Sequence, residues 1–252
     1  MTGWEALAVA LAGLAAGTIN TVVGSGTLVT FPVLLAVGYP PVLANVSNTV
    51  GLVPGSVSGA IGYRAELSGQ RARLLRLGSA STIGAVLGAA ALLVLPDDAF
   101  RAVVPVLIGL ACVLVVVQPR VSGWLAGRGR TAHPHGGPLL YAGVLGAGVY
   151  GGYFGAAQGV LLIAVMGLLL DEDLQRINAA KNVLAGLVNL VAALVFIAVT
   201  DVAWLAAGLI ALGAVVGGQL GAQIGRKVPQ SVLRALVVLV GLVAITAIVL
   251  DL

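Results

Sequence analysis

The sequence predicts an all-α polytopic membrane protein built as an inverted repeat of two five-segment halves. Of the 252 residues, 60% are hydrophobic and only 9% are charged, whereas soluble domains contain roughly 25% charged residues. Stretches such as 139–170 and 202–224 carry no charge at all and reach the ~20 residues that a spanning helix needs. A glycine-broken apolar segment also occurs twice. These observations exclude a soluble domain and predict a helical bundle in a lipid bilayer.

Each half is expected to contain a broken helical hairpin followed by three full spans. The ten segments are expected at 4–22, 26–38, 41–63, 73–95, 100–118, 137–154, 159–170, 177–200, 202–225 and 229–250. The first membrane repeat is therefore placed at 1–118, a basic cytoplasmic linker at 119–136 and the second, inverted repeat at 137–252. An odd number of segments inverts the second copy, as in many secondary transporters.

The first segment is expected to be a retained helix. Its only early charge is Glu5, and a signal peptide requires a basic start. It leads into AGTINTVVGSGTLVTFPVLL from Ala16, where glycines interrupt an apolar run that then resumes. GAGVYGGYFGAAQGVLLIAVM from Gly146 follows the same plan. Each of these stretches is the predicted broken hairpin of its half.

The third segments of the two halves are related by a weak alignment. Residues 47–60 align with 181–194, which pairs Ser47 with Lys181 and Asn48 with Asn182. The similarity is low residue by residue but holds in order and spacing. It supports the repeat independently of the glycine breaks.

The fourth segment of each half carries small residues at every fourth position, namely Ala80, Gly84 and Gly88 in one and Gly213, Gly217, Gly221 and Gly225 in the other. A small-xxx-small face lets two helix backbones approach closely. We expect these two helices to be equivalent, central and closely packed, with direct ligand contact as the alternative role of the glycines.

The distribution of charge predicts the orientation. One side collects Arg64, Arg71, Arg73, Arg76, Arg120, Arg128, Arg130, Arg176, Arg226 and Lys227, and the other collects Glu5, Asp97, Asp98, Asp201 and Asp251 with only Arg101. The positive-inside rule assigns the basic side to the cytoplasm and both termini to the outside. Topology thus explains the net charge of +4, and no nucleic-acid partner is expected.

The glycine breaks are the candidate substrate site. Unpaired backbone groups in hydrocarbon are tolerated only where protein or a water-filled cavity satisfies them, and a helix that resumes after a break favours an anion at its N-terminus. We expect the two breaks to meet near the bilayer midplane and form one cavity. The candidate substrate-binding residues are Asn20, Gly24, Ser25, Gly26, Thr27, Asn48, Tyr150, Gly155, Gln158, Lys181, Asn182 and Asn189. Tight turns without a ligand and asparagines that only join helices are the alternatives.

Lys181 is the one charge that lies clearly inside a spanning pattern. A charge at bilayer depth costs at least ~2.5 kcal/mol on insertion scales, so it usually faces a cavity or a partner. Lys181 has no acidic partner at that depth, and a bound anion is its predicted counter-charge. The alternative is that its stem extends to the cytoplasmic headgroups.

No catalytic or metal-binding pattern is present in the sequence. His133 and His135 lie in a basic loop without a third ligand, and Cys112 stands alone in an apolar run, which leaves it a packing role. Nothing resembles a nucleophile with a base and an orienting acid. We therefore expect no enzyme activity, no cofactor and no metal.

The stretch AGTINTVVGSGTLVTFPVLLAVGYPPVLANVSNTVGLVPGSVSGAIGYR, Ala16–Arg64, resembles the sulfite exporter TauE/SafE family of bacterial membrane proteins, and Gly146–Ile197 follows the same pattern. The resemblance implies a proton-linked transporter of sulfite, organosulfonates or related organic anions in the inner (plasma) membrane of a prokaryote. The sequence departs from the family pattern in two places: GSGT lacks a run of consecutive glycines, and GVLLIAVM lacks the usual proline.

Alternating access between the inverted halves is the expected mechanism. The expected partners are the small anion, the lipid bilayer and protons as coupling ion, and a homo-oligomer is left open. A channel for small anions or neutral solutes is the first alternative, and a membrane scaffold or enzyme subunit is the second.

Overall fold

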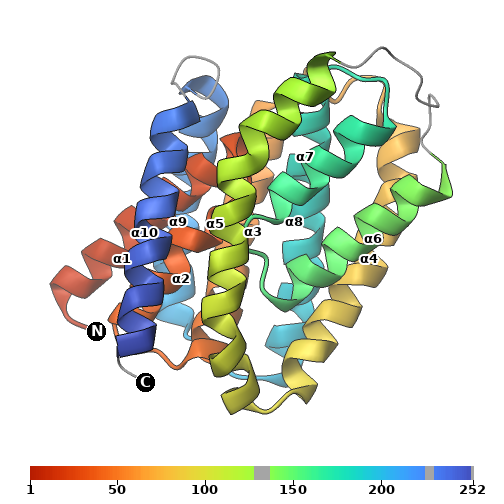
Figure 1. Cartoon of the computed structure of the whole chain (residues 1–252). Helices are drawn as coiled ribbons and strands as arrows, with labels where there is room; N and C mark the ends of the chain where they lie inside the picture. The colour runs from red at the N-terminus through yellow and green to blue at the C-terminus, as the bar shows by residue number, and fades with distance from the viewer. Residues whose placement is uncertain (128–136, 225–229, 251–252) are drawn as a thin grey trace.

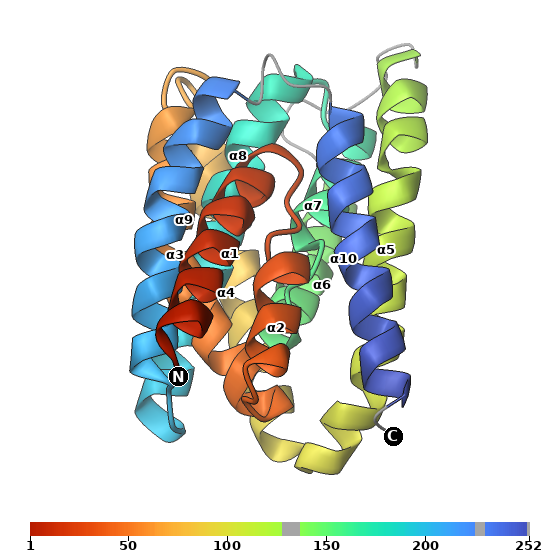
Figure 2. The same cartoon turned by 90° about the vertical axis from the view of Figure 1, so that its left-hand side faces the viewer.

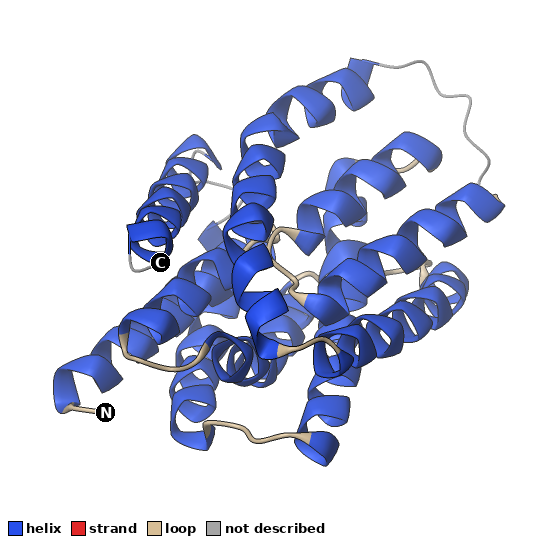
Figure 3. Ribbon diagram, turned by 60° about the horizontal axis from the view of Figure 1, so that its bottom comes forward, coloured by secondary structure: helices blue, strands red, loops and turns tan. Residues whose placement is uncertain are grey.

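The computed structural model describes residues 1–127, 137–224 and 230–250, and all the elements in this part of the chain are helices (Figures 1 and 3). Their bounds are α1 Gly3–Val22, α2 Thr27–Ala36, α3 Pro41–Gly62, α4 Arg71–Val94, α5 Asp97–Gly127, α6 Pro138–Tyr153, α7 Gln158–Leu169, α8 Leu174–Val199, α9 Trp204–Ile224 and α10 Gln230–Leu250. The ten predicted segments are therefore confirmed as ten helices. The main difference is α5, which passes through Pro119 and continues into the segment predicted as a linker.

Five of the described helices are long and apolar enough to cross a membrane: α1, α4, α5, α8 and α9. The second helix of each broken hairpin is shorter, with 10 residues in α2 and 12 in α7. An ideal helix rises ~1.5 Å per residue, so neither α2 nor α7 can cross a hydrocarbon core of ~30 Å by itself. The short helices must therefore begin inside the bundle.

Several sequence features explain where the helices begin and end. Thr2 and Glu5 form a capping box at the start of α1, and the Asp173 side chain accepts a hydrogen bond from the Gln175 N–H at the start of α8. α3 begins at Pro41, where the missing N–H needs no helical partner. These local signals set the starts of α1, α3 and α8, which the sequence analysis placed at residues 4, 41 and 177.

The start of α1 and the end of α10 lie at one end of the bundle, and the starts of α4 and α8 lie at the other (Figure 1). The latter end holds an ion cluster in which Glu172 Oε2 lies 2.8 Å from Arg73 and Glu172 Oε1 lies 2.7 Å from Arg176. Burial raises the pKa of Glu172, but the hydrogen bonds and charges of Arg73 and Arg176 outweigh it and hold the pKa below its ordinary value. The cluster is thus ionised at neutral pH.

The ion cluster also joins the α3–α4 loop to the α7–α8 loop. Gln70 donates to the Arg176 carbonyl at 3.0 Å, and Arg176 donates to the Ser68 carbonyl at 3.0 Å. The structure therefore brings basic loops from both halves together, as predicted. The basic residues Arg128, Arg130, Arg226 and Lys227, together with Asp251, lie outside the described residues, and the cytoplasmic assignment of this end stays a prediction.

Glycines on α4 and α9 bring helix backbones into direct contact, as the small-residue pattern predicted. A Cβ added at Gly84 would lie 2.8 Å from the Val149 backbone nitrogen on α6. One added at Gly221 would lie 2.8 Å from the Thr18 carbonyl oxygen on α1. Gly225 lies outside the described residues. Both helices also expose large apolar side chains on another face, such as Leu87 and Leu212, so the expectation that they are central is wrong.

The contacts of the two halves are reciprocal. α1, the first helix of the first half, packs on α9, the fourth helix of the second, and α6 packs on α4 in the same way. α3 and α8 pack against each other. A two-fold relation between the halves would produce this exchange, but the inverted repeat and the domain division at 118 and 137 stay predictions.

Candidate functional site

The first helix of each broken hairpin ends in the same way. Val23 and Gly24 both donate their N–H to the Ile19 carbonyl, and Phe154 and Gly155 both donate to the Tyr150 carbonyl. Gly24 has φ +91° and Gly155 has φ +79°, a conformation that other residues adopt only with strain. These two glycines therefore correspond and end α1 and α6 inside the bundle.

The two breaks meet, as predicted from the repeat. The Gly159 N–H at the start of α7 donates to the Gly24 carbonyl at 3.1 Å. A Cβ added at Gly24 would lie 2.5 Å from the Gly159 Cα, so only glycines allow this approach. Figure 2 shows α2 returning beside α1 from the first break. The shared cavity and its position at the bilayer midplane stay predictions.

Lys181 lies inside the protein with no exposed surface. Its Nζ donates to the carbonyl oxygens of Asn20 at 2.8 Å and Thr21 at 3.2 Å, in the last turn of α1. These carbonyls belong to the negative end of the helix dipole and lack intrahelical partners. The alternative that Lys181 extends to the headgroups is therefore wrong, and the carbonyl end of α1 provides part of its counter-charge.

Two asparagines on the same face of α8 also cap α1. The side-chain amides of Asn178 and Asn182 donate to the Thr21 carbonyl at 3.4 and 3.3 Å. Asn178 was not among the predicted site residues, although its i, i+3, i+4 spacing with Lys181 and Asn182 places all three on one helix face. That spacing was the signal that could have identified it.

The aligned helix α3 provides the corresponding contacts from the first half. The Asn48 amide is held by α2, since it donates to Thr27 Oγ1 at 3.3 Å and its oxygen accepts from the Thr30 hydroxyl. Asn45, also missing from the predicted set, donates to the Tyr153 carbonyl at the end of α6 at 3.0 Å. The third helix of each half, α3 or α8, thus uses asparagines to cap the broken helix of the other half. α3 also holds the short helix of its own half, α2, through Asn48.

Two buried polar groups without a protein partner lie at the starts of α2 and α7. Ser25 is fully buried and Gln158 is 3% exposed, and within the described residues neither Ser25 Oγ nor Gln158 Nε2 has a hydrogen-bond partner. The Gln158 amide packs against Gly151, where a Cβ would overlap it. Neither helix N-terminus is capped by a side chain. Such groups are rare in folded proteins and call for a ligand or water.

The second break is shaped by a strained residue and a tyrosine. Ala157, just before α7, has φ +60°, which is left-handed and uncommon for a residue with a Cβ. The Tyr150 hydroxyl donates to the Ala156 carbonyl at 2.6 Å. Tyr150 therefore holds the backbone of the break. Strain of this kind is typical of functional sites.

Two predicted site residues have other roles in this structure. Asn189 donates to Ser56 Oγ at 3.4 Å across the contact of α8 with α3, so it does not join the group at the breaks. Asn20 contributes its backbone carbonyl, which accepts a hydrogen bond from Lys181. A Cβ added at Gly26 would lie 3.0 Å from the Cβ of Asn20. Among the described residues, the Asn20 side chain contributes close packing against the first break.

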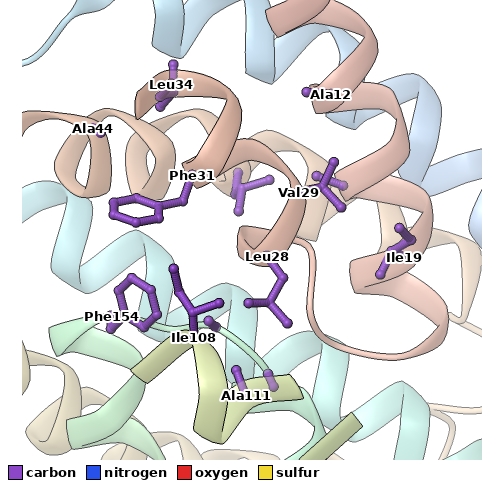
Figure 4. Close-up of a cluster of buried hydrophobic side chains, with 14 of the residues drawn as sticks. Ala12, Ile19, Leu28, Val29, Phe31, Leu34, Ala44, Ile108, Ala111 and Phe154 are labelled. Carbon is purple, nitrogen blue, oxygen red and sulfur yellow. The ribbon is translucent and has the colours of Figure 1, made fainter. Parts of the chain in front are cut away.

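An apolar cluster covers one side of the breaks (Figure 4). Phe31 of α2 and Phe154 of the second break pack edge to face, with ring centroids 5.2 Å apart and an interplanar angle of 88°. Phe100 of α5 lies 6.2 Å from Phe154 and 5.7 Å from Tyr153, measured between centroids. This cluster joins α2, α5 and α6 and keeps water away from that side of the broken segments.

A bundle of apolar helices with buried polar groups at two crossing breaks defines a multi-pass membrane protein of the transporter class. The family model of the sulfite exporter TauE/SafE family matches residues 9–248, and the chain belongs to this family. Matching relatives are all named as probable membrane transporter proteins. YfcA of Escherichia coli strain K12 is 25% identical over 90% of this chain and 83% of its own length.

Two further relatives have similar coverage. ORF9 of Sinorhizobium sp is 25% identical over 92% of this chain and 87% of its own length. A probable membrane transporter protein of Haemophilus influenzae is 24% identical over 95% of this chain and 92% of its own length. No solved structure matches the chain. With the apolar helices of the fold, these relatives make the chain a multi-pass membrane transporter of a prokaryotic membrane.

Proposed function

We propose that the chain is a secondary transporter that moves a small anion, such as sulfite, an organosulfonate or a related organic anion, by alternating access. The observation that supports this most is the pair of buried, unpaired donors, Ser25 Oγ and Gln158 Nε2, at two uncapped helix N-termini. Their breaks are joined by the Gly159–Gly24 hydrogen bond. Hydroxyl and amide donors at helix N-termini suit an anion.

Lys181 adds a positive charge beside this group. A Cβ added at Gly159 would lie 2.7 Å from the Lys181 Cδ, so the lysine stem passes directly under the start of α7. Its charge is offset in part by the α1 carbonyls, and no carboxylate is recorded as its partner among the described residues. An anion held by Ser25 and Gln158 would supply the remaining counter-charge.

The burial of the breaks favours a transporter over a channel. Ser25, Thr27, Gln158 and Lys181 are at most 6% exposed, so the site is closed to solvent on both sides in this structure. The ion cluster of Arg73, Glu172 and Arg176 lies at one end of the bundle, and the aromatic cluster covers another side of the breaks. A closed site that opens to one side at a time is what alternating access requires.

Flux measurements on purified protein in liposomes test this proposal. We expect saturable uptake of an organosulfonate such as methanesulfonate, exchange against the same anion inside, and accumulation driven uphill by a proton gradient. A channel would give flux that neither saturates nor accumulates, and a scaffold would give none. Thermal stabilisation by sulfite, sulfate, sulfonates and carboxylates, measured in parallel, identifies the preferred anion class.

A further inference from the structure

The hydrogen bonds of Lys181 leave one of its protons without an acceptor. An ammonium group has three N–H donors, and two of them are accepted by the carbonyls of Asn20 and Thr21. No acceptor for the third is recorded among the described residues. A neutral amine retains two N–H donors, so it can keep both carbonyl bonds. Loss of the third proton therefore leaves the contact between α8 and α1 intact.

Within the described part of the chain, the helices around Lys181 provide no carboxylate that would hold it in the charged form. The helices that pack against α8 are α1, α3, α4, α6 and α7. α3 and α7 have no ionisable side chain, and α1 has only Glu5, which lies at its opposite end. The other ionisable groups on these helices are Arg71, Arg73 and Arg76 at the start of α4, Arg176 on α8 itself, and Tyr141, Tyr150 and Tyr153 on α6.

These tyrosines do not offer a counter-charge. The Tyr150 hydroxyl donates to the Ala156 carbonyl at 2.6 Å, and the Tyr141 hydroxyl lies 3.1 Å from Ser79 Oγ. Tyr153 packs its ring on Phe100. A buried charge without an opposite charge is costly, and such a group tends to become neutral. In such surroundings a bound anion would decide the charge state of Lys181.

We propose that Lys181 is the group that carries the coupling proton, so that one proton and one anion bind, cross and leave together. The inference rests on the proposed anion transport. A bound anion favours the ammonium form, and by reciprocal linkage the ammonium form favours the anion. When the anion leaves, the third N–H proton passes to water on the side to which the site is open. The amine lone pair then takes up a proton from the opposite side in the next cycle, and no other reactant is consumed.

The position of Lys181 lets it respond to opening of the site. Its Nζ contacts the end of α1, and its stem lies against Gly159 at the start of α7. The two helices belong to different broken hairpins, whose breaks join at Gly24. A shift of one hairpin against the other would change the access of water to the amine.

Replacement of Lys181 by arginine separates proton coupling from charge alone, because a guanidinium keeps its charge but does not release a proton. Methanesulfonate is the probe, because it stays ionised at all relevant pH values. In liposomes, the wild-type protein is expected to exchange methanesulfonate and to accumulate it under a proton gradient. Lys181→Arg is expected to keep measurable exchange, at a reduced rate, and to lose the gradient-driven accumulation.

Asn189→Ala serves as the matched control, since it removes a hydrogen bond of the same helix, to Ser56 Oγ and away from the breaks, without removing a titratable group. It is expected to retain gradient-driven accumulation. Accumulation by Lys181→Arg at the wild-type level would overturn the inference. Absence of exchange by the wild-type protein would instead contradict the proposed transport function, and the inference would fall with it.

Proton uptake on binding provides a measurement that needs no variant. Mixing methanesulfonate with the purified wild-type protein in weakly buffered solution is expected to take up protons, to a limit of one per anion. The apparent affinity should then fall by about tenfold per pH unit on the alkaline side of the titration, as linkage to one proton requires. Binding without proton uptake at any pH would overturn the inference. This test uses the wild-type protein alone and stays decisive if the arginine variant fails to fold.

Discussion

Replacement of Gln158 by methionine is expected to weaken anion binding by about tenfold or more while leaving the fold at least as stable. The Gln158 amide is buried and its Nε2 has no protein partner. A buried unpaired donor costs about 1–3 kcal/mol, and a hydrogen bond to a charged group contributes about 1.5–3 kcal/mol. Because 1.4 kcal/mol corresponds to a tenfold change in affinity, loss of this donor should be readily measured as a change in Kd.

Gln118→Met is the matched control for this variant. Gln118 on α5 is 6% exposed, and its Oε1 has no partner within the described residues. It belongs to neither broken hairpin and lies in an apolar pocket beside Val160 and Ile163. It should change thermal stability without changing anion affinity. A Gln158→Met variant with lower stability and wild-type affinity would show that the amide is structural.

Replacement of Gly88 by alanine is expected to destabilise the protein strongly. The added Cβ would overlap the Val149 carbonyl oxygen and lie 2.7 Å from the Tyr153 backbone nitrogen. Both are backbone atoms of α6, so α4 and α6 must separate to make room. Overpacking of a close contact typically costs about 1–3 kcal/mol. The change should appear as a lower thermal unfolding temperature and a lower yield of folded protein.

Gly146→Ala provides the comparison on α6, because no atom lies within 4 Å of the Cβ that it would add. Alanine at an open helical position stabilises by about 0.4–1 kcal/mol through the unfolded chain. The two variants should therefore shift the unfolding temperature in opposite directions. Equal unfolding temperatures would contradict the close packing of α4 on α6.

Local features of the sequence were sufficient to predict the helices and the close contacts. Gly24 and Gly155 interrupt apolar runs, and glycines are the residues that end helices in a left-handed conformation. The small-residue faces of α4 and α9 also predicted close approach. They could not predict the partner helices, α6 for α4 and α1 for α9. A face of small residues indicates that another helix approaches closely, but it does not indicate which one. The continuation of α5 through Pro119 was missed because proline usually ends a helix.

The site was predicted in part. The meeting of the two breaks followed from the repeat, but the acceptors of Lys181 did not. They are the backbone carbonyls of Asn20 and Thr21, about 160 residues away in the chain. Every residue has a backbone carbonyl, so the residue type does not indicate which carbonyl accepts a hydrogen bond. Asn45 and Asn178 were missed for the same reason, since each donates to a carbonyl of a distant helix.

The most direct test of the anion site is the binding of methanesulfonate and sulfite to the wild-type protein and to Lys181→Gln, measured by calorimetry with thermal stability as the folding control. Glutamine keeps N–H donors for the α1 carbonyls but removes the charge. The wild-type protein is expected to bind the preferred anion, and the folded glutamine variant to bind it at least about tenfold more weakly, as loss of a hydrogen bond to a charged group implies. Equal affinity in the two proteins would contradict a site in which Lys181 balances the charge of the anion.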